Sequence, residues 1–288
     1  MNIQAFFDPA TWTLTYVVWD PDTRDAVVID PVMDFDPLAV EVSDTSSERV
    51  VAYCREHDLN VHLVLDTHAH ADHLSGFQHL KRELGAQIGI GSQISVVQGV
   101  FKGIFNFGDE FATDGSQWDV LFEDGKPVSF GSLTIEPIHS PGHTPACYAY
   151  KIRDAVFTGD VLFMPDQGTG RCDFPGGSAT DLYKSIKRLY AMPDATRVFV
   201  GHDYQPGGRE VAWETTVGAS KAGNVHLPDS MSEEEFVKFR TERDAKLQPP
   251  RLIFQSLQVN ANAGILPEPE SNGLRYLRMP LGIFAKEA

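Results

Sequence analysis

The chain has 288 residues, of which 42% are hydrophobic, and this is enough to build one large folded domain or two small ones. Its formal charge of -16 at pH 7 opposes binding to a phosphate backbone, and no cluster of Lys and Arg longer than two residues interrupts the acidic sequence. Nucleic acid is therefore not an expected partner.

The N-terminal sequence MNIQAFFDPATW has no basic stretch followed by a long apolar one, and no run of about 18 apolar residues occurs. We therefore expect a soluble, cytoplasmic protein that does not act at a membrane. The three cysteines are too few and too dispersed for a disulfide framework, and they form no CxxC pair: Cys54, Cys147 and Cys172. Any bound metal must be held by histidine and carboxylate side chains.

The first half of the chain predicts short strands followed by two helices. WTLTYVVWD and DAVVIDP are rich in β-branched and aromatic residues and flank the turn-like DPDTRD, which indicates a β-meander. Residues 43–59 predict a helix, and VHLVLDT at 61–67 predicts the strand after it. Leucine and phenylalanine then recur at helical spacing up to Gly85, so Asp72 and His73 are expected at or near a helix N-terminus.

Residues 86–160 read mainly as strands, interrupted by the Phe- and Gly-rich 101–111, which we expect to be a loop or lid. Two capping signals predict later helices: Ser178 with Asp181, and Ser232 with Glu235. The sequence after Pro249 and Pro250 gives no clear pattern. Strands and helices interleave, so we predict one α/β domain, residues 1–225, with a helical and irregular C-terminal extension, residues 226–288, packed on it.

The sequence THAHADHLSG, residues 67–76, places four potential metal donors within six positions: His68, His70, Asp72 and His73. Three more follow predicted strands: His143 in SPGHT, Asp160 in FTGD and His202 in VGHDY. Because α/β folds bind ligands at strand ends, we expect these side chains to converge. The remaining histidines lack this context and are expected to be structural or surface residues: His57, His62, His79, His139 and His226.

The pattern HxHxDH, followed by His, Asp and His in PGH, TGD and GHDY, resembles the metallo-β-lactamase superfamily over about residues 10–215. The resemblance implies an αββα sandwich with the metal site along one edge of its two sheets. A two-metal version of the pattern would use His68, His70 and His143 for one ion, and Asp72, His73 and His202 for the other, with Asp160 bridging.

Two subfamilies that act on glutathione compounds resemble the second half of the chain. GRCDF at 170–174 is similar to the GRxDF signature of persulfide dioxygenases, whereas hydroxyacylglutathione hydrolases (glyoxalase II) generally have Lys at the position of Arg171. MSEEEFVKF at 231–239 also resembles the dioxygenases. That subfamily implies one Fe(II) per chain on a facial triad of His68, His143 and Asp160, with positions left open for sulfur and O2. The remaining donors would support these ligands and orient substrate or water: His70, Asp72, His73 and His202.

The resemblance further implies that the substrate is glutathione persulfide, which O2 and water convert to sulfite and glutathione. Arg171 and Tyr204 match positions that handle glutathione, although a salt bridge from Arg171 to Asp173 and simple packing of Tyr204 are the alternatives. Cys172 lies inside the signature and reads either as a small loop residue or as an oxidisable thiol.

Other functions remain open at this stage. A thioester hydrolase would use two metal ions to activate water against S-lactoylglutathione, and every donor for a second ion is present. A metal-dependent sensor or binding module is the third alternative, and a β-lactamase is disfavoured because GRxDF has no place there. Compared with shorter persulfide dioxygenases, residues 92–117 and the tail beyond 240 are extended, and we expect a homodimer by resemblance. Within the first extension, the phenylalanines would wall a channel, form a dimer contact or pack in the core: Phe101, Phe105 and Phe107.

Overall fold

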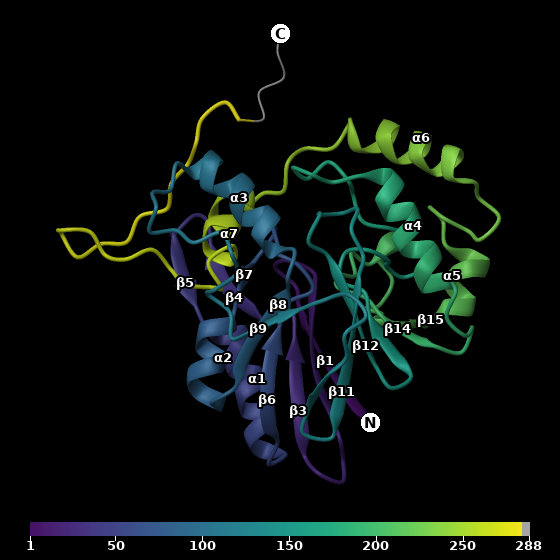
Figure 1. Ribbon diagram of the computed structural model, residues 1–288, viewed down its shortest axis with the longest axis horizontal. Helices are drawn as coiled ribbons and strands as arrows, with labels where there is room; N and C mark the ends of the chain where they lie inside the picture. The colour runs from purple at the N-terminus through teal and green to yellow at the C-terminus, as the bar shows by residue number, and fades with distance from the viewer. Residues whose placement is uncertain (284–288) are drawn as a thin grey trace.

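The computed structural model describes residues 1–283, which form two six-stranded β-sheets that pack face to face (Figure 1). The first sheet contains, in spatial order, β1 (Asn2–Asp8), β2 (Thr13–Trp19), β3 (Asp25–Ile29), β6 (Asn60–Leu65), β8 (Gln87–Gly91) and β9 (Val120–Phe122). The second contains β10 (Val128–Phe130), β11 (Leu133–His139), β12 (Tyr148–Ile152), β13 (Ala155–Phe157), β14 (Arg197–Phe199) and β15 (Glu214–Thr216). A small third sheet joins β5 (Glu41–Ser43), β4 (Val32–Asp36) and β7 (Leu74–Ser75).

Helices cover the outer face of each large sheet (Figure 1). On the side of the first sheet lie α1 (Thr45–Glu56), α2 (Phe77–Leu84), α3 (Ile94–Phe105) and α7 (Ile253–Asn260), and on the side of the second lie α4 (Ala179–Tyr190), α5 (Val217–Gly223) and α6 (Glu233–Asp244). This arrangement confirms the predicted αββα sandwich. No helix within residues 1–283 is both long and apolar enough to cross a membrane.

The alternation of side chains along β2 explains the two layers of the core. Leu14, Tyr16 and Val18 belong to the cluster between the two sheets. Val17 and Trp19 point to the opposite face and pack with the helices of the first sheet. Since both faces of the strand are covered, every residue of β2 is buried, as in strands at the centre of a layered α/β fold.

The helix starts that the sequence signalled most clearly are confirmed. Ser178 Oγ accepts a hydrogen bond from the Asp181 N–H at the start of α4, at 3.1 Å. At the start of α6, Ser232 Oγ accepts from the Glu235 N–H, and the Glu235 carboxylate accepts from the Ser232 N–H, which completes a capping box.

Two local predictions were wrong. The expected loop or lid at 101–111 begins inside α3, where Phe101 and Phe105 are buried in the core. Gly99 and Gly103 are poor helix formers and obscured the helical spacing of the apolar residues. Helix α2 begins at Phe77, well after Asp72, because the intervening residues form β7 against β4.

The C-terminal extension crosses from one outer layer to the other. Helix α6 packs against α4, and its Phe236 joins the core between the sheets. The chain then runs along the top of the molecule to α7, which packs on β7 and α3 on the side of the first sheet (Figure 1). The division at residue 225 stays a prediction, but the described part of the extension contributes side chains to both large core clusters.

Candidate metal centre

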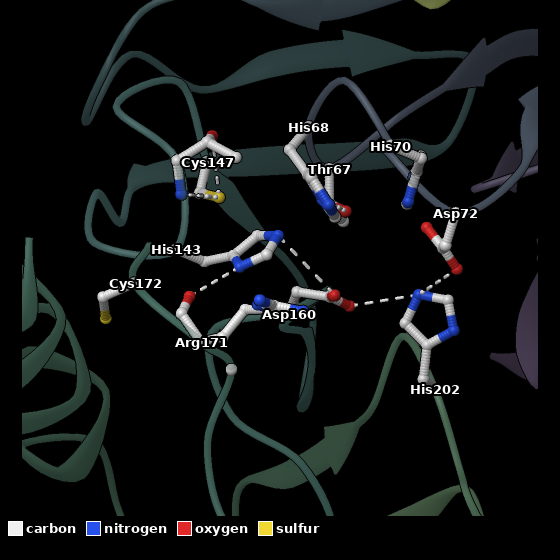
Figure 2. A network of polar contacts seen from close by, with 12 residues as sticks. Thr67, His68, His70, Asp72, His143, Cys147, Asp160, Arg171, Cys172 and His202 are labelled. Atoms are coloured by element: carbon white, nitrogen blue, oxygen red, sulfur yellow. Dashed lines mark hydrogen bonds and ion pairs between the residues drawn. The ribbon is translucent and has the colours of Figure 1, made fainter. Parts of the chain in front are cut away.

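Seven potential metal donors meet at one edge of the two sheets, at the carboxyl ends of the strands that deliver them, and Figure 2 labels all of them except His73. The HxHxDH motif follows β6, which is parallel to β3 and β8. Asp160 and His202 follow β13 and β14, which are also parallel, and His143 lies in the loop between β11 and β12. The expected convergence of these side chains is therefore present in the fold.

Three of these donors, His68, His143 and Asp160, form what we call the first donor group. Their donor atoms all lie within 4.8 Å of one another, and all three residues are buried. His143 Nε2 is 3.7 Å from one carboxylate oxygen of Asp160. Because His68 comes from the first sheet and the other two from the second, this group bridges the sandwich.

His70, Asp72 and His73 have donor atoms within 4.8 Å of one another, and with His202 we call them the second donor group. His202 Nε2 lies 3.4 Å from an Asp72 oxygen and 3.2 Å from Asp160 Oδ1. The other oxygen of Asp160 faces His143, so Asp160 lies between the two groups (Figure 2). The geometry therefore has room for one ion or for two.

The donor atoms are buried without hydrogen-bond partners, and this is the strongest sign that a cation belongs here. The orphaned atoms include His68 Nε2, His70 Nδ1, Asp72 Oδ2, His73 Nε2, Asp160 Oδ1 and His202 Nε2. A buried polar atom without a partner costs roughly 1–3 kcal/mol, so several such atoms facing one another would be unfavourable alone. A metal ion satisfies them together, and the residues present fit one.

Four of the five histidines also have a protein partner on the other ring nitrogen, as metal ligands usually do. The contacts are His143 Nδ1 to the Arg171 carbonyl at 2.7 Å, His73 Nδ1 to the Leu74 carbonyl at 3.0 Å, His70 Nε2 to Asp30 Oδ1 at 3.1 Å, and His68 Nδ1 to Thr67 Oγ1 at 3.0 Å. A carbonyl oxygen can only accept, so His143 and His73 carry the proton on Nδ1. Their Nε2 lone pairs are therefore free for a metal.

The protonation of the histidines differs within the motif. Burial lowers the pKa of His68 well below its usual range, and burial lowers that of His73 to about 4. Both rings are therefore neutral at pH 7 and available as ligands. Burial also disfavours the charged form of His70, but the Asp30 carboxylate outweighs it and raises the pKa of His70 to about 10. A metal ion at His70 would bind the orphaned Nδ1 and displace the proton there, while the Nε2 proton stays in the hydrogen bond to Asp30.

Asp30 organises the motif loop, and sequence reasoning missed it. Its carboxylate accepts hydrogen bonds from the Thr67 N–H at 2.7 Å and the Thr67 hydroxyl at 3.0 Å, besides its contact with His70. Asp30 follows β3 in a left-handed conformation, with φ of 52°. An aspartate at the end of a buried strand, in VIDP, was the available signal, because β3 and β6 are parallel neighbours whose ends meet.

The donors line several cavities, and two of these adjoin at His143 and Arg171. The smaller, of about 210 Å³, is lined by donors of both groups and by aromatic rings, including Trp12, Asp72, His143, Asp160 and Tyr204. The larger, of about 440 Å³, shares His143 and Arg171 with it. The chain between α6 and α7 walls the larger cavity through Leu247 and Pro250. A volume of this size suits a small-molecule ligand.

Arg171 and Tyr204 both lie in the smaller cavity, as their proposed substrate role requires. Arg171 donates from Nε and Nη2 to both carboxylate oxygens of Asp173, at 2.5 Å each, so the salt bridge considered as its alternative is present. The Tyr204 ring lies parallel to the His202 ring, with centroids 5.8 Å apart, and the same distance from the ring of Trp12. Both residues thus have a packing role besides any contact with substrate.

The cysteines and the other histidines have ordinary structural roles in the described chain. Burial raises the pKa of Cys172 above its usual range, which keeps the thiol protonated at neutral pH, and Cys54 and Cys147 are buried. The histidines expected to lie outside the site bind other groups: His57 to the Tyr53 carbonyl, His62 to Asp25, His79 to Asp44 and Glu48, His139 to the Pro145 carbonyl and His226 to the Thr169 N–H.

The sequence model of the metallo-beta-lactamase superfamily matches residues 13–202 of this chain. The chain is 49% identical to a Beta-lactamase hydrolase-like protein of Agrobacterium fabrum, over 98% of this chain and 65% of that protein. It is 42% identical to Glyoxylase B2 of Dictyostelium discoideum, over 97% of each. It is 30% identical to the mitochondrial persulfide dioxygenase ETHE1 of Homo sapiens, over 91% of this chain and 89% of that protein.

Two solved structures are informative about the centre. ETHE1 from Myxococcus xanthus superimposes with a TM-score of 0.73 and 30% identity, over 92% of this chain and 100% of that chain. TTHA1623, solved in a di-iron-bound form, superimposes with a TM-score of 0.56 and 25% identity, over 77% of this chain and 98% of that chain. The relatives thus include proteins named as hydrolases and as dioxygenases.

Proposed function

Since the chain belongs to the metallo-β-lactamase superfamily, we propose that this metalloenzyme is a persulfide dioxygenase that converts glutathione persulfide, O2 and water to sulfite and glutathione. The observation that carries the proposal is that His143 and Asp160 of the first donor group line the same cavity as Arg171 of GRCDF. The 30% identity to human persulfide dioxygenase and the likeness to ETHE1 of Myxococcus xanthus support it.

The first donor group has the chemistry of an iron site. Two imidazoles and one carboxylate make the facial triad of non-haem Fe(II) oxygenases. When bound there, Fe(II) would supply the redox chemistry that O2 requires and that zinc lacks. The side chains of this group would hold the ion, and His143 and Asp160 also line the cavity from which the substrates would approach.

The charges around the centre favour entry of an anionic thiol compound from the cavity of Arg171. Nε and Nη2 of Arg171 are bonded to Asp173, so Nη1 is the group that we propose makes a charge-assisted contact to a glutathione carboxylate, in a protein whose net charge of -16 otherwise repels anions. His73 lines a different cavity, of about 410 Å³, whose walls carry four carboxylates, those of Asp8, Asp34, Asp36 and Glu41, against one guanidinium, that of Arg251. An anionic substrate is disfavoured on that acidic side.

Aromatic rings form part of the wall of the smaller cavity. Trp12 and Tyr204 line it, and the Tyr204 ring also lies 6.2 Å from the ring of Phe163. Phe174 and Ile253 line the adjoining larger cavity. We propose that these side chains hold the carbon skeleton of glutathione, while Arg171 orients a carboxylate and Asp160 faces the reacting sulfur.

A thioester hydrolase is the second candidate, and a specific observation favours it. The second donor group is complete, and the contact of Asp30 with His70 is the carboxylate–histidine arrangement that supports many metal ligands. The relative named Glyoxylase B2, at 42% identity, agrees with this candidate. Two bound ions would activate water rather than O2.

One aerobic assay separates the two candidates. Protein loaded with Fe(II) is mixed with glutathione persulfide in an oxygen electrode, sulfite is quantified, and bound metal is counted on the same sample. We expect one O2 consumed per sulfite formed and about one iron per chain. Hydrolysis of S-lactoylglutathione without oxygen consumption, together with two metal ions per chain, would replace the dioxygenase with the hydrolase.

A further inference from the structure

Arg240, in α6, is one of the largest fully buried side chains of the described residues, with only 1% of its surface exposed. Its Nε donates to the carboxylate of Asp244 at 3.0 Å, within the same helix. Its Nη1 donates to the carbonyls of Thr169 and Gly170, at 3.2 and 3.1 Å. A side chain of the extension is thus anchored on the loop that carries GRCDF.

Asp244 also binds the backbone of the same loop. Its carboxylate accepts a hydrogen bond from the Cys172 N–H at 2.7 Å. Arg240 therefore holds the backbone immediately before Arg171, and Asp244 holds the backbone immediately after it. The peptide carbonyl of Arg171 is fixed from both sides.

That carbonyl is the acceptor for His143 Nδ1, at 2.7 Å. Its position sets the tilt of the imidazole ring and keeps the proton on Nδ1, so that Nε2 faces Asp160. Gly170 also packs directly against the backbone of Asp160, so closely that a Cβ at position 170 would collide with the Asp160 carbonyl oxygen. Any shift of this loop would displace two donors of the first group.

Helix α7 makes comparable hydrogen bonds to the backbone of the HxHxDH motif, which carries three residues of the second donor group. The Asn260 amide donates to the carbonyls of His70 and His73, at 2.8 Å each, and its oxygen accepts from the Ser75 N–H at 2.8 Å. Only 1% of Asn260 is exposed. One amide side chain therefore fixes the backbone of two histidines of the motif.

We propose that Arg240, Asp244 and Asn260 are positioning residues for the metal centre, and that the two halves of the centre are each held by one helix of the C-terminal extension. All three lie beyond residue 202, where the family match ends. A buried ion pair is a weak source of stability because desolvation offsets its attraction. The Arg240–Asp244 pair makes three hydrogen bonds to backbone groups of residues 169–172. These bonds support a role in orienting the loop.

The inference rests on the metal centre of the proposed function but not on the reaction. Arg240→Lys keeps the charge and most of the apolar stem but loses the fork, Asp244→Asn loses the acceptor for Cys172, and Asn260→Ala loses the amide. Control variants remove similar contacts elsewhere: Arg197→Lys breaks the bidentate pair with Glu214, and Gln258→Ala, within α7, breaks three amide hydrogen bonds to Phe254 and Arg278.

The test is the affinity of each folded protein for Fe(II), measured by competition with a chelator, with the thermal midpoint of the metal-free protein recorded alongside. We expect about 10–100-fold weaker binding in the three variants, as for other residues that support metal ligands, and less than about twofold change in the controls. All measurements are made well below the lowest midpoint, and Asp244→Asn tests the loop independently of Arg240→Lys.

Unchanged Fe(II) affinity in Arg240→Lys and Asp244→Asn, with lower thermal midpoints only, would mean that α6 merely stabilises the fold and would overturn the inference. If the parent protein consumed no O2 with glutathione persulfide, while the variants still bound metal more weakly than the controls, the proposed function would fail and the positioning role would stand.

Discussion

The two donor groups differ in how the chain assembles them. Three donors of the second group lie within four positions of one loop, whereas His68, His143 and Asp160 come from three loops of two sheets. The second group is therefore mostly present once the loop after β6 forms. The first group exists only when the sheets have packed, so its metal affinity is tied to the tertiary structure.

The groups also face different surroundings. His143 and Asp160 of the first group line cavities that contain Arg171, and Asp72 of the second group shares the smaller of them. His73 of the second group lines a separate cavity, whose walls carry four carboxylates and Arg251. His70 is further tied to the buried carboxylate of Asp30. On the proposed function, proximity of the donors alone would not decide which group holds the ion, and the charge and access around each group would contribute to that selection.

The largest effect expected from this contrast comes from removing one donor of each group. His143→Ala should lower oxygen consumption by at least about 100-fold and lose the bound iron, because it removes a ligand of the first group. His73→Ala should keep about one iron per chain and lose less activity. Metal analysis and an oxygen electrode measure both, with His62→Ala as the control. Equal losses of metal in the two variants would favour a dinuclear centre.

Acid sensitivity should arise partly from His226, which lies outside both groups. Burial and the nearby charges of Arg240 and Arg243 lower the pKa of His226 to about 4, against about 6.5 in the unfolded chain. The unfolded state thus binds more protons between these values, so stability falls as the pH drops from about 6.5 to 4, by on the order of 2 kcal/mol.

His226→Gln keeps an acceptor for the Thr169 N–H and removes the titrating ring. Urea unfolding of parent and variant at equal metal content, from pH 7 to 4, should show a flatter profile for the variant. Parallel profiles would assign the acid sensitivity to the donor groups instead.

Substitution of Trp12 tests whether the smaller cavity binds the substrate. This residue lines the smaller cavity and has a left-handed backbone, with φ of 59°, which is unfavourable for a bulky side chain. Trp12→Gly should raise KM for glutathione persulfide about tenfold, a loss of about 1.4 kcal/mol of binding, while stability changes by less than about 1 kcal/mol because glycine relieves the strain. Trp12→Phe should keep most of the affinity in the same kinetic assay. A normal KM in Trp12→Gly would exclude this ring from substrate binding.

The smallest expected effect comes from a substitution that lowers the stability of α6 without changing the hydrogen bonds of Arg240 and Asp244 to the loop at 169–172. Ser232→Ala removes the capping box at the start of α6 and should cost about 1 kcal/mol of unfolding free energy. Iron affinity should stay within about twofold of the parent, since Arg240 and Asp244 lie at the opposite end of the helix. Thermal unfolding and chelator competition measure the two quantities. A parallel loss of iron would show that the whole helix, and not its last turn, supports the centre.

Motifs close together in the sequence were interpreted well. The clustered histidines, the aspartate in TGD and the caps of α4 and α6 depend on neighbours within a few positions, and the structure brings them where their patterns indicated. Helix α3 was missed because glycines interrupt its apolar spacing, and α7 because Asn and Pro surround it. In both helices the apolar face is stabilised by packing against the core rather than by local propensity.

The sequence by itself determined the superfamily fold and the donor set, because both rest on residue types at short, fixed spacing. Only the tertiary structure decided which polar residues support those donors. Asp30, Arg240 and Asn260 reach the centre from distant parts of the chain. A buried polar group forms its hydrogen bond with a neighbour that the fold places beside it, and the local sequence does not show which residue that neighbour is.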